Sequence, residues 1–201
     1  MIQLHQVIKM KVIKENVTNS IIINKSEFIT LLYKVESIDE VNSILNETNK
    51  KYRDATHCCY AYILESNHKC SDDGEPSGTA GLPMLDVLKK NKLDHILCIV
   101  VRYFGGIKLG AGGLLRAYVS SLTEALDKTE VIEAKIGTRI KFMVSYDRQK
   151  EIDKLLNKFE TTKTYNSQVE YEVVLDDEVL DSLKTKNIEY EVIKKDYISA
   201  I

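Results

Sequence analysis

RYFGGIKLGAGGLLR, residues 102–116, holds five of the nine glycines of the chain: Gly105, Gly106, Gly110, Gly112 and Gly113. The β-branched apolar run 95–104 leads into this stretch and predicts a buried strand. Apolar residues follow at the spacing of an amphipathic helix, namely Leu114, Tyr118 and Leu122. We therefore expect the glycines to form a loop between a strand and a helix.

Such a loop at a helix N-terminus exposes unpaired N–H groups and the positive end of the helix dipole, which together favour an anion. Lys108 lies in the loop and Arg116 in the first turn of the predicted helix. Because cations are unfavourable at that end of a helix, we expect a negative group to compensate them. The glycine spacing fits neither the P-loop nor the dinucleotide fingerprint. The pattern leaves an anion site and mere tight packing of a turn both open.

Composition and net charge indicate an ordinary globular protein. The 201 residues carry a net charge of −2, so any basic site must be local, and 44% of them are hydrophobic, as in ordinary globular chains. No apolar run approaches the ~20 residues of a membrane span, and we expect no membrane partner. The four cysteines lack a Cys-x-x-Cys pair, which favours reduced buried thiols over metal ligands. A cytoplasmic location is the resulting expectation.

Outward from the glycine stretch, hydrophobic periodicity predicts the other elements. Before it we expect strands at 7–14, 27–35 and 55–64, a helix after the capping box of Ser37 and Glu40, a polar loop at 65–73 and a helix at 82–90. After residue 134 we expect, in order, a strand, a helix, two strands, a helix and a strand: 136–144, 148–159, 161–165, 168–175, 178–184 and 188–194. That βαββαβ order is typical of the ferredoxin-like split unit.

A second polar stretch, SDDGEPSGT at residues 71–79, gathers three carboxylates. With His57, the carboxylates of Asp72, Asp73 and Glu75 could bind a divalent metal or act as acid and base. However, neighbouring Asp72 and Asp73 seldom converge on one ion. We favour the alternative that these carboxylates pair with the cations of the glycine stretch, at Arg102, Lys108 or Arg116.

The remaining candidates in this region have structural interpretations. Ser77 and Thr79 precede a predicted helix, so we expect them to cap it rather than to act as nucleophiles. His57 lies on a predicted strand among apolar neighbours, which favours a hydrogen-bonded core histidine over a base.

Three motifs together resemble the IMPACT/YigZ family: Thr56-His57-x-Cys-x-Ala61, residues 71–83 and residues 102–118. The resemblance covers about residues 1–130, and the rest looks like the second domain of bacterial members. It implies an α+β protein with two domains. Residues 1–133 would be similar to the ribosomal-protein-like β-α-β domain IV of elongation factor G, and residues 134–201 would be ferredoxin-like.

The resemblance implies a noncatalytic binding protein that contacts RNA, the ribosome or another translation component. Two alternatives stay open. One is a small-molecule hydrolase or phosphate-handling enzyme that uses His57, Asp72, Asp73 and Glu75. The other is a protein-interaction module in stress signalling, which would share this fold and would present an exposed apolar or charged patch away from the two loops. Eukaryotic relatives restrain the amino-acid-starvation kinase with help from an additional domain, so the resemblance does not carry that role over.

No cofactor or metal is expected, and the oligomeric state stays open. The residues predicted to bind an anion or RNA are Arg102, Gly105, Gly106, Lys108, Gly110, Gly112, Gly113 and Arg116, with Ser77, Gly78 and Thr79 from the second loop.

Overall fold

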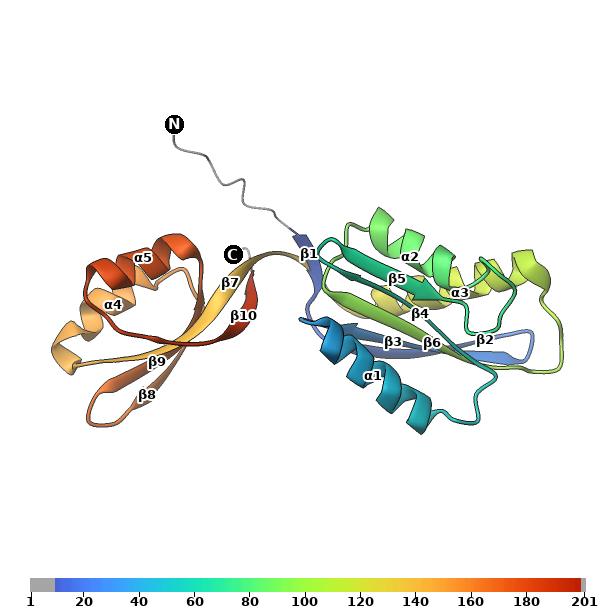
Figure 1. Ribbon diagram of the computed structural model, residues 1–201, viewed down its shortest axis with the longest axis horizontal. Helices are drawn as coiled ribbons and strands as arrows, with labels where there is room; N and C mark the ends of the chain where they lie inside the picture. The colour runs from blue at the N-terminus through green and yellow to red at the C-terminus, as the bar shows by residue number, and fades with distance from the viewer. Residues whose placement is uncertain (1–9, 200–201) are drawn as a thin grey trace, which may run out of the picture. The chain divides into compact units, whose positions relative to one another are not determined.

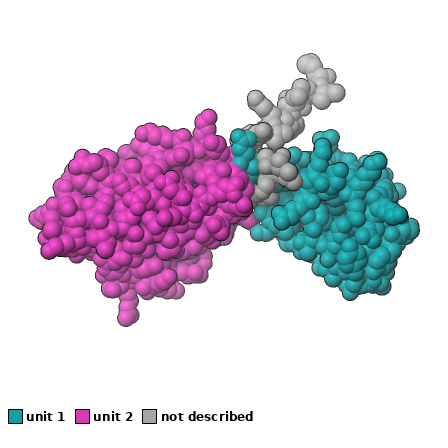
Figure 2. Space-filling view, turned by 180° about the vertical axis from the view of Figure 1, so that it is seen from behind, with its two compact units in different colours: residues 1–9, 133–201 teal, residues 10–132 magenta. Residues whose placement is uncertain are grey.

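The computed structural model describes residues 10–199, which form an α+β protein with two antiparallel sheets and five α-helices. These residues divide into two compact units, 10–132 and 133–199 (Figure 2). Of the strand expected at 7–14, residues 7–9 lie outside the described residues, and β1 spans Met10–Ile13.

The first unit is built on a five-stranded sheet with the order β2-β3-β6-β4-β5. All of its neighbouring strands are antiparallel. Its strands and helices are β2 (Val17–Ile23), β3 (Ser26–Lys34), α1 (Ile38–Lys51), β4 (His57–Leu64), β5 (Asn67–Ser71), α2 (Gly81–Lys90), β6 (Ile96–Tyr103) and α3 (Gly110–Leu126).

Helices cover both faces of this sheet, α1 on one side and α2 with α3 on the other (Figure 1). Because side chains alternate along a strand, β4 feeds both cores. Cys59 and Ala61 join the core with α2 and α3, whereas Tyr62 and Leu64 join the core with α1. Each face of the sheet therefore has its own hydrophobic core.

Three elements of this unit differ from expectation. Strand β2 was not predicted, and β5 replaces the loop expected at 65–73. Both are outermost strands, which pair with β3 and β4. The side chains of β5 are mainly polar, whereas β2 carries the β-branched residues Val17, Thr18 and Ile21–Ile23, a strand signal that the prediction overlooked. Helix α3 begins at Gly110, so three of the glycines lie in its first turn rather than in a loop.

The second unit has the expected element order, strand-helix-strand-strand-helix-strand, with the 3₁₀ turn η1 (Tyr146–Arg148) before its first helix. Strand β7 pairs with both β9 and β10, and β8 pairs with β9. Helices α4 and α5 share one core with β7 and β9 through residues such as Ile152, Leu183 and Tyr171. The bounds are β7 (Val131–Val144), α4 (Gln149–Leu155), β8 (Thr161–Tyr165), β9 (Val169–Leu175), α5 (Asp177–Thr185) and β10 (Glu191–Ser199).

Candidate binding site

A buried ion pair joins the two sequence motifs. Arg102 near the end of β6 donates through Nη1 to Oε1 of Glu75 at 2.6 Å. Tyr118 of α3 donates its hydroxyl to the same oxygen at 2.8 Å, and His57 Nε2 lies 3.7 Å from Glu75 Oε2. The expected pairing of a cation of the glycine stretch with a carboxylate of 71–79 is confirmed for this pair. The two loops therefore meet in one polar network.

The burial of Arg102 corrects the expectation that it contacts an anion directly. Arg102 is 5% exposed, and its guanidinium carbon lies 5.4 Å from the ring centroid of Phe28 and 5.6 Å from that of Phe104. Its Nη2 donates to Ser26 Oγ at 3.4 Å. A buried charge requires a partner inside the protein, and Glu75 supplies it. Arg102 therefore holds the motifs together.

Asp72 caps α2 from a distance in the sequence. Its carboxylate accepts N–H bonds from Gly78 at 2.8 Å, from Ala80 at 3.0 Å and from Gly81 at 2.8 Å. Ala80, the N-cap residue of α2, offers no side-chain oxygen of its own. Partial burial raises the pKa of Asp72, but the three N–H bonds outweigh it and leave that pKa below its usual value.

This arrangement corrects the expectation that Ser77 and Thr79 cap the helix. Thr79 is buried and donates its hydroxyl to the carbonyl of Pro76 at 2.6 Å. The amide of Gly78 is already bound by Asp72. Of these three loop residues, Ser77 is exposed. The Gly78 amide and the Thr79 hydroxyl therefore form hydrogen bonds within the protein.

The carboxylates of the second motif also separate from one another. Asp73 accepts the main-chain N–H of Cys58 through Oδ2 at 2.6 Å. Its main-chain carbonyl lies 2.8 Å from Nδ1 of His57, and since a carbonyl oxygen only accepts, Nδ1 is the donor. His57 is thus the hydrogen-bonded histidine that its neighbours predicted. Asp72, Asp73 and Glu75 have three different sets of partners, and residues 10–199 contain no group of three side chains suited to a metal ion.

The N-terminus of α3 differs from that of α2, because no side chain caps its amides. Its first-turn amides have no acceptor four residues earlier, and Leu109, at the N-cap, provides no side-chain cap. No acidic residue lies in that turn. Gly110, Ala111 and Gly112 are exposed, and so are Lys108 and Arg116. Within residues 10–199 neither cation forms an ion pair, so the expected compensation exists for Arg102 alone.

Close packing against the β2–β3 turn fixes the loop before α3. A Cβ on Gly105 would lie 1.9 Å from the carbonyl oxygen of Lys25, so only glycine fits there. The amide of Gly105 donates to Ser26 Oγ at 3.1 Å and is unavailable to a ligand. Gly106 and Gly110 have φ values of +85° and +70°, which favour glycine. Close packing therefore accounts for Gly105, whereas the glycines at the start of α3 lie at an exposed helix end without a side-chain cap.

Three exposed side chains on the same loop and turn were not among the predicted site residues. Phe104 is 46% exposed and Ile107 43% exposed. Lys25, at the tip of the β2–β3 turn, is exposed as well, and its carbonyl faces Gly105. The pairing of β2 with β3 brings Lys25 to this loop, and β2 was not predicted although its β-branched residues favour a strand.

Within residues 10–199, no helix combines the length and the apolar character needed to cross a membrane. All four cysteines are free thiols. Burial raises the pKa of Cys58 to about 11, which keeps it protonated at neutral pH.

Comparison with known proteins gives consistent matches. A family model described as the Impact N-terminal domain matches residues 24–126. "IMPACT family member YvyE" of Bacillus subtilis is 49% identical over 127 residues, which are 62% of this chain and 58% of that protein. An "IMPACT family member" of Haemophilus influenzae is 36% identical over 146 residues, 69% of each chain. A solved chain titled "Crystal structure of an hypothetical protein" is 28% identical, covers 92% of this chain and 98% of its own length, and has a TM-score of 0.66.

Proposed function

Because the chain belongs to the IMPACT family, we propose that it is a noncatalytic, cytoplasmic binding protein that contacts the RNA of the translation machinery. The binding site is the N-terminus of α3, where RNA phosphates meet the amides of the first turn. One observation carries the proposal: that turn is exposed and uncapped, and exposed Lys108 and Arg116 flank it without ion-pair partners in the described residues.

The chemistry of the turn suits a phosphate. Free amides and the helix dipole favour an anion, and two nearby cations add charge-assisted bonds. Arg102 contributes indirectly, since its pair with Glu75 keeps the strand end and the loop in place. Exposed Phe104, in the loop that leads to α3, offers a ring on which a base can stack.

The fold supports the same class of partner. We propose that the second unit is ferredoxin-like, since β7 pairs with β9 and β10 in a strand-helix-strand-strand-helix-strand chain. The first unit would correspond to the ribosomal-protein-like domain IV of elongation factor G. A protein built from two such units fits a role on the ribosome.

Ribosome co-sedimentation at two salt concentrations tests the site. Lys108→Glu/Arg116→Glu places two negative charges where phosphates would lie, so we expect at least tenfold weaker binding. Removal of two phosphate contacts should also reduce the slope of log affinity against log salt by about 2. The matched control is Lys89→Glu/Lys90→Glu, an equal charge change in the last turn of α2. Equal losses in both variants, or unchanged binding in the first, would remove the site.

A further inference from the structure

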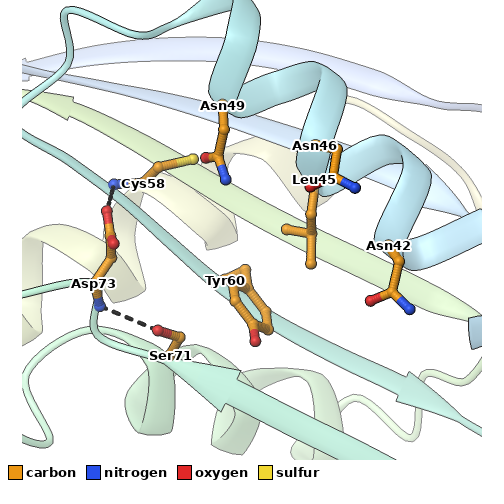
Figure 3. Close-up of a pocket in the computed structure, with 8 residues that line it drawn as sticks. All are labelled: Asn42, Leu45, Asn46, Asn49, Cys58, Tyr60, Ser71 and Asp73. Carbon is orange, nitrogen blue, oxygen red and sulfur yellow. Dashed lines mark hydrogen bonds between the residues drawn. The ribbon is translucent and has the colours of Figure 1, made fainter.

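A polar pocket lies on the α1 side of the first unit's sheet, opposite the face that carries α2 and α3 (Figures 1 and 3). Its volume is about 290 Å³. Asn42, Asn46 and Asn49 of α1 form one wall, and Tyr60 of β4 lies across from them. Ser71 and Asp73, from the end of β5 and the loop after it, complete the lining together with Cys58 and Leu45.

Three carboxamides dominate the wall of this pocket. Asn42, Asn46 and Asn49 follow the i, i+4, i+7 spacing that places residues on one face of a helix. All three are exposed, and none has a hydrogen-bond partner within residues 10–199. Each carboxamide offers an acceptor oxygen and two donor hydrogens, the same pair of functions that a peptide unit presents. One asparagine can thus form two hydrogen bonds with a single extended residue, because the N–H and the C=O of that residue point to the same side of the strand.

The spacing along α1 suits an extended chain. At ~1.5 Å per helical residue, Asn42 and Asn46 are separated by about 6 Å along the axis. Alternate residues of an extended strand repeat every ~6.6 Å and face the same side. The wall from Asn42 to Asn49 spans roughly 10 Å, the length of about three extended residues. A short peptide segment therefore fits this wall in length, and the spacing of Asn42 and Asn46 matches that of alternate residues in an extended strand.

The charge of the pocket selects among peptides. Asp73 is the one charged residue among the lining residues. Its Oδ2 is held by the N–H of Cys58, and its own N–H donates to Ser71 Oγ at 3.2 Å, so the carboxylate is fixed in position. No lysine, arginine or histidine lines the pocket, which disfavours phosphate groups. The ring of Tyr60 and the side chain of Leu45 offer apolar contact to a peptide's side chains.

We propose that this groove binds an extended peptide segment of a partner protein, with a lysine or arginine of that segment paired to Asp73. The asparagines hold the peptide main chain, and Asp73 sets the preference for a basic residue. This site is separate from the phosphate site at α3, because α1 and α3 cover opposite faces of the sheet. The protein therefore has one surface for RNA and another for a basic protein segment.

Selection from a random octapeptide library displayed on phage, with the full chain as bait, tests the proposal. We expect the enriched peptides to share a basic residue and to bind Asn42→Ala/Asn46→Ala/Asn49→Ala at least tenfold more weakly than the unmodified chain. Alanine favours a helix more than asparagine does, so this variant keeps α1 folded. Ser43→Ala/Glu47→Ala/Lys50→Ala is the control, because it changes three α1 residues outside the pocket lining without altering net charge.

Asp73→Asn separates the contribution of the Asp73 charge from that of the asparagine hydrogen bonds. It retains an oxygen for the N–H of Cys58 and removes the charge, so we expect the enriched peptides to lose their preference for a basic over a neutral residue by about tenfold. Three outcomes would overturn the proposal: no enrichment above background, enriched peptides that bind the triple asparagine variant within twofold, or a preference for acidic peptides. Binding of an octa-uridylate probe that is lost in the triple variant would assign the groove to nucleic acid instead.

Discussion

At the scale of single residues, Arg102 carries a full positive charge into the interior of the first unit. Glu75 compensates that charge, and Phe28 and Phe104 stack near the guanidinium. A buried pair of this kind adds little net stability over a well-packed apolar pair, but removal of one partner leaves an uncompensated charge. The pair therefore fixes the relation between the two loops more than it stabilises the fold.

The first prediction concerns that pair. Arg102→Met should lower the free energy of unfolding by about 3–5 kcal/mol, because it leaves the Glu75 carboxylate buried without a cation. Adding Glu75→Gln should restore part of the loss, since the amide is neutral and still accepts the Tyr118 hydroxyl. Urea unfolding of the two single variants and the double variant measures the coupling. Additive losses would contradict the assignment, and Lys108→Met, at an exposed site, should stay within about 0.5 kcal/mol of the unmodified chain.

At the scale of elements, helix α2 depends on a residue outside its own end. Its first-turn amides would lack acceptors, since Ala80 has no capping oxygen. Asp72 accepts from Ala80 and Gly81 instead, and from Gly78 in the preceding turn. The carboxylate thereby holds the second motif as a compact turn, from which Glu75 reaches Arg102.

The second prediction follows from the lowered pKa of Asp72. A carboxyl whose folded pKa lies below its unfolded value stabilises the fold above the unfolded pKa, here 3.8, and loses that effect as pH falls through the folded pKa. At neutral pH, Asp72→Asn should cost about 1–2 kcal/mol, the usual range for a helix cap. The difference from the unmodified chain should shrink steadily as the pH drops below 3.8.

Urea unfolding at a series of pH values measures this difference. Asp86→Asn is the matched control, because Asp86 is exposed on the same helix and caps nothing. A stability difference for Asp72→Asn that stays constant through the acid range would show that the charge of Asp72 does not contribute.

Apolar periodicity predicted the central strands β3, β4 and β6 and the existence of all five helices, because each of these elements buries an apolar face. It failed at the edge strand β5, whose side chains are mainly polar, and it overlooked β2, whose β-branched residues favour a strand. Charge compensation predicted the pairing of Arg102 with a carboxylate. It did not predict the burial of Arg102, which depends on Phe28 from another strand. The cap by Asp72 also escaped prediction, because local rules place the capping residue next to the helix.

At the scale of the whole molecule, the two units have separate hydrophobic cores. The residues of the core shared by α2 and α3, and those of the core under α1, come from residues 13–126. The core of the second unit draws only on residues 140–190. No described residue belongs to both sets, so a cavity in one core should not loosen the packing of the other.

The third prediction tests that separation with matched truncations. Leu183→Ala and Leu122→Ala each remove a fully buried leucine, one from each unit. Each should destabilise its own unit by about 2–5 kcal/mol. Hydrogen exchange measured by mass spectrometry should show faster exchange in β9 and α5 for Leu183→Ala, with β6 and α3 unchanged, and the reverse for Leu122→Ala. Loss of protection throughout both units in either variant would mean that the chain unfolds as one cooperative body. The RNA and peptide sites of the first unit would then depend on the second unit for their stability.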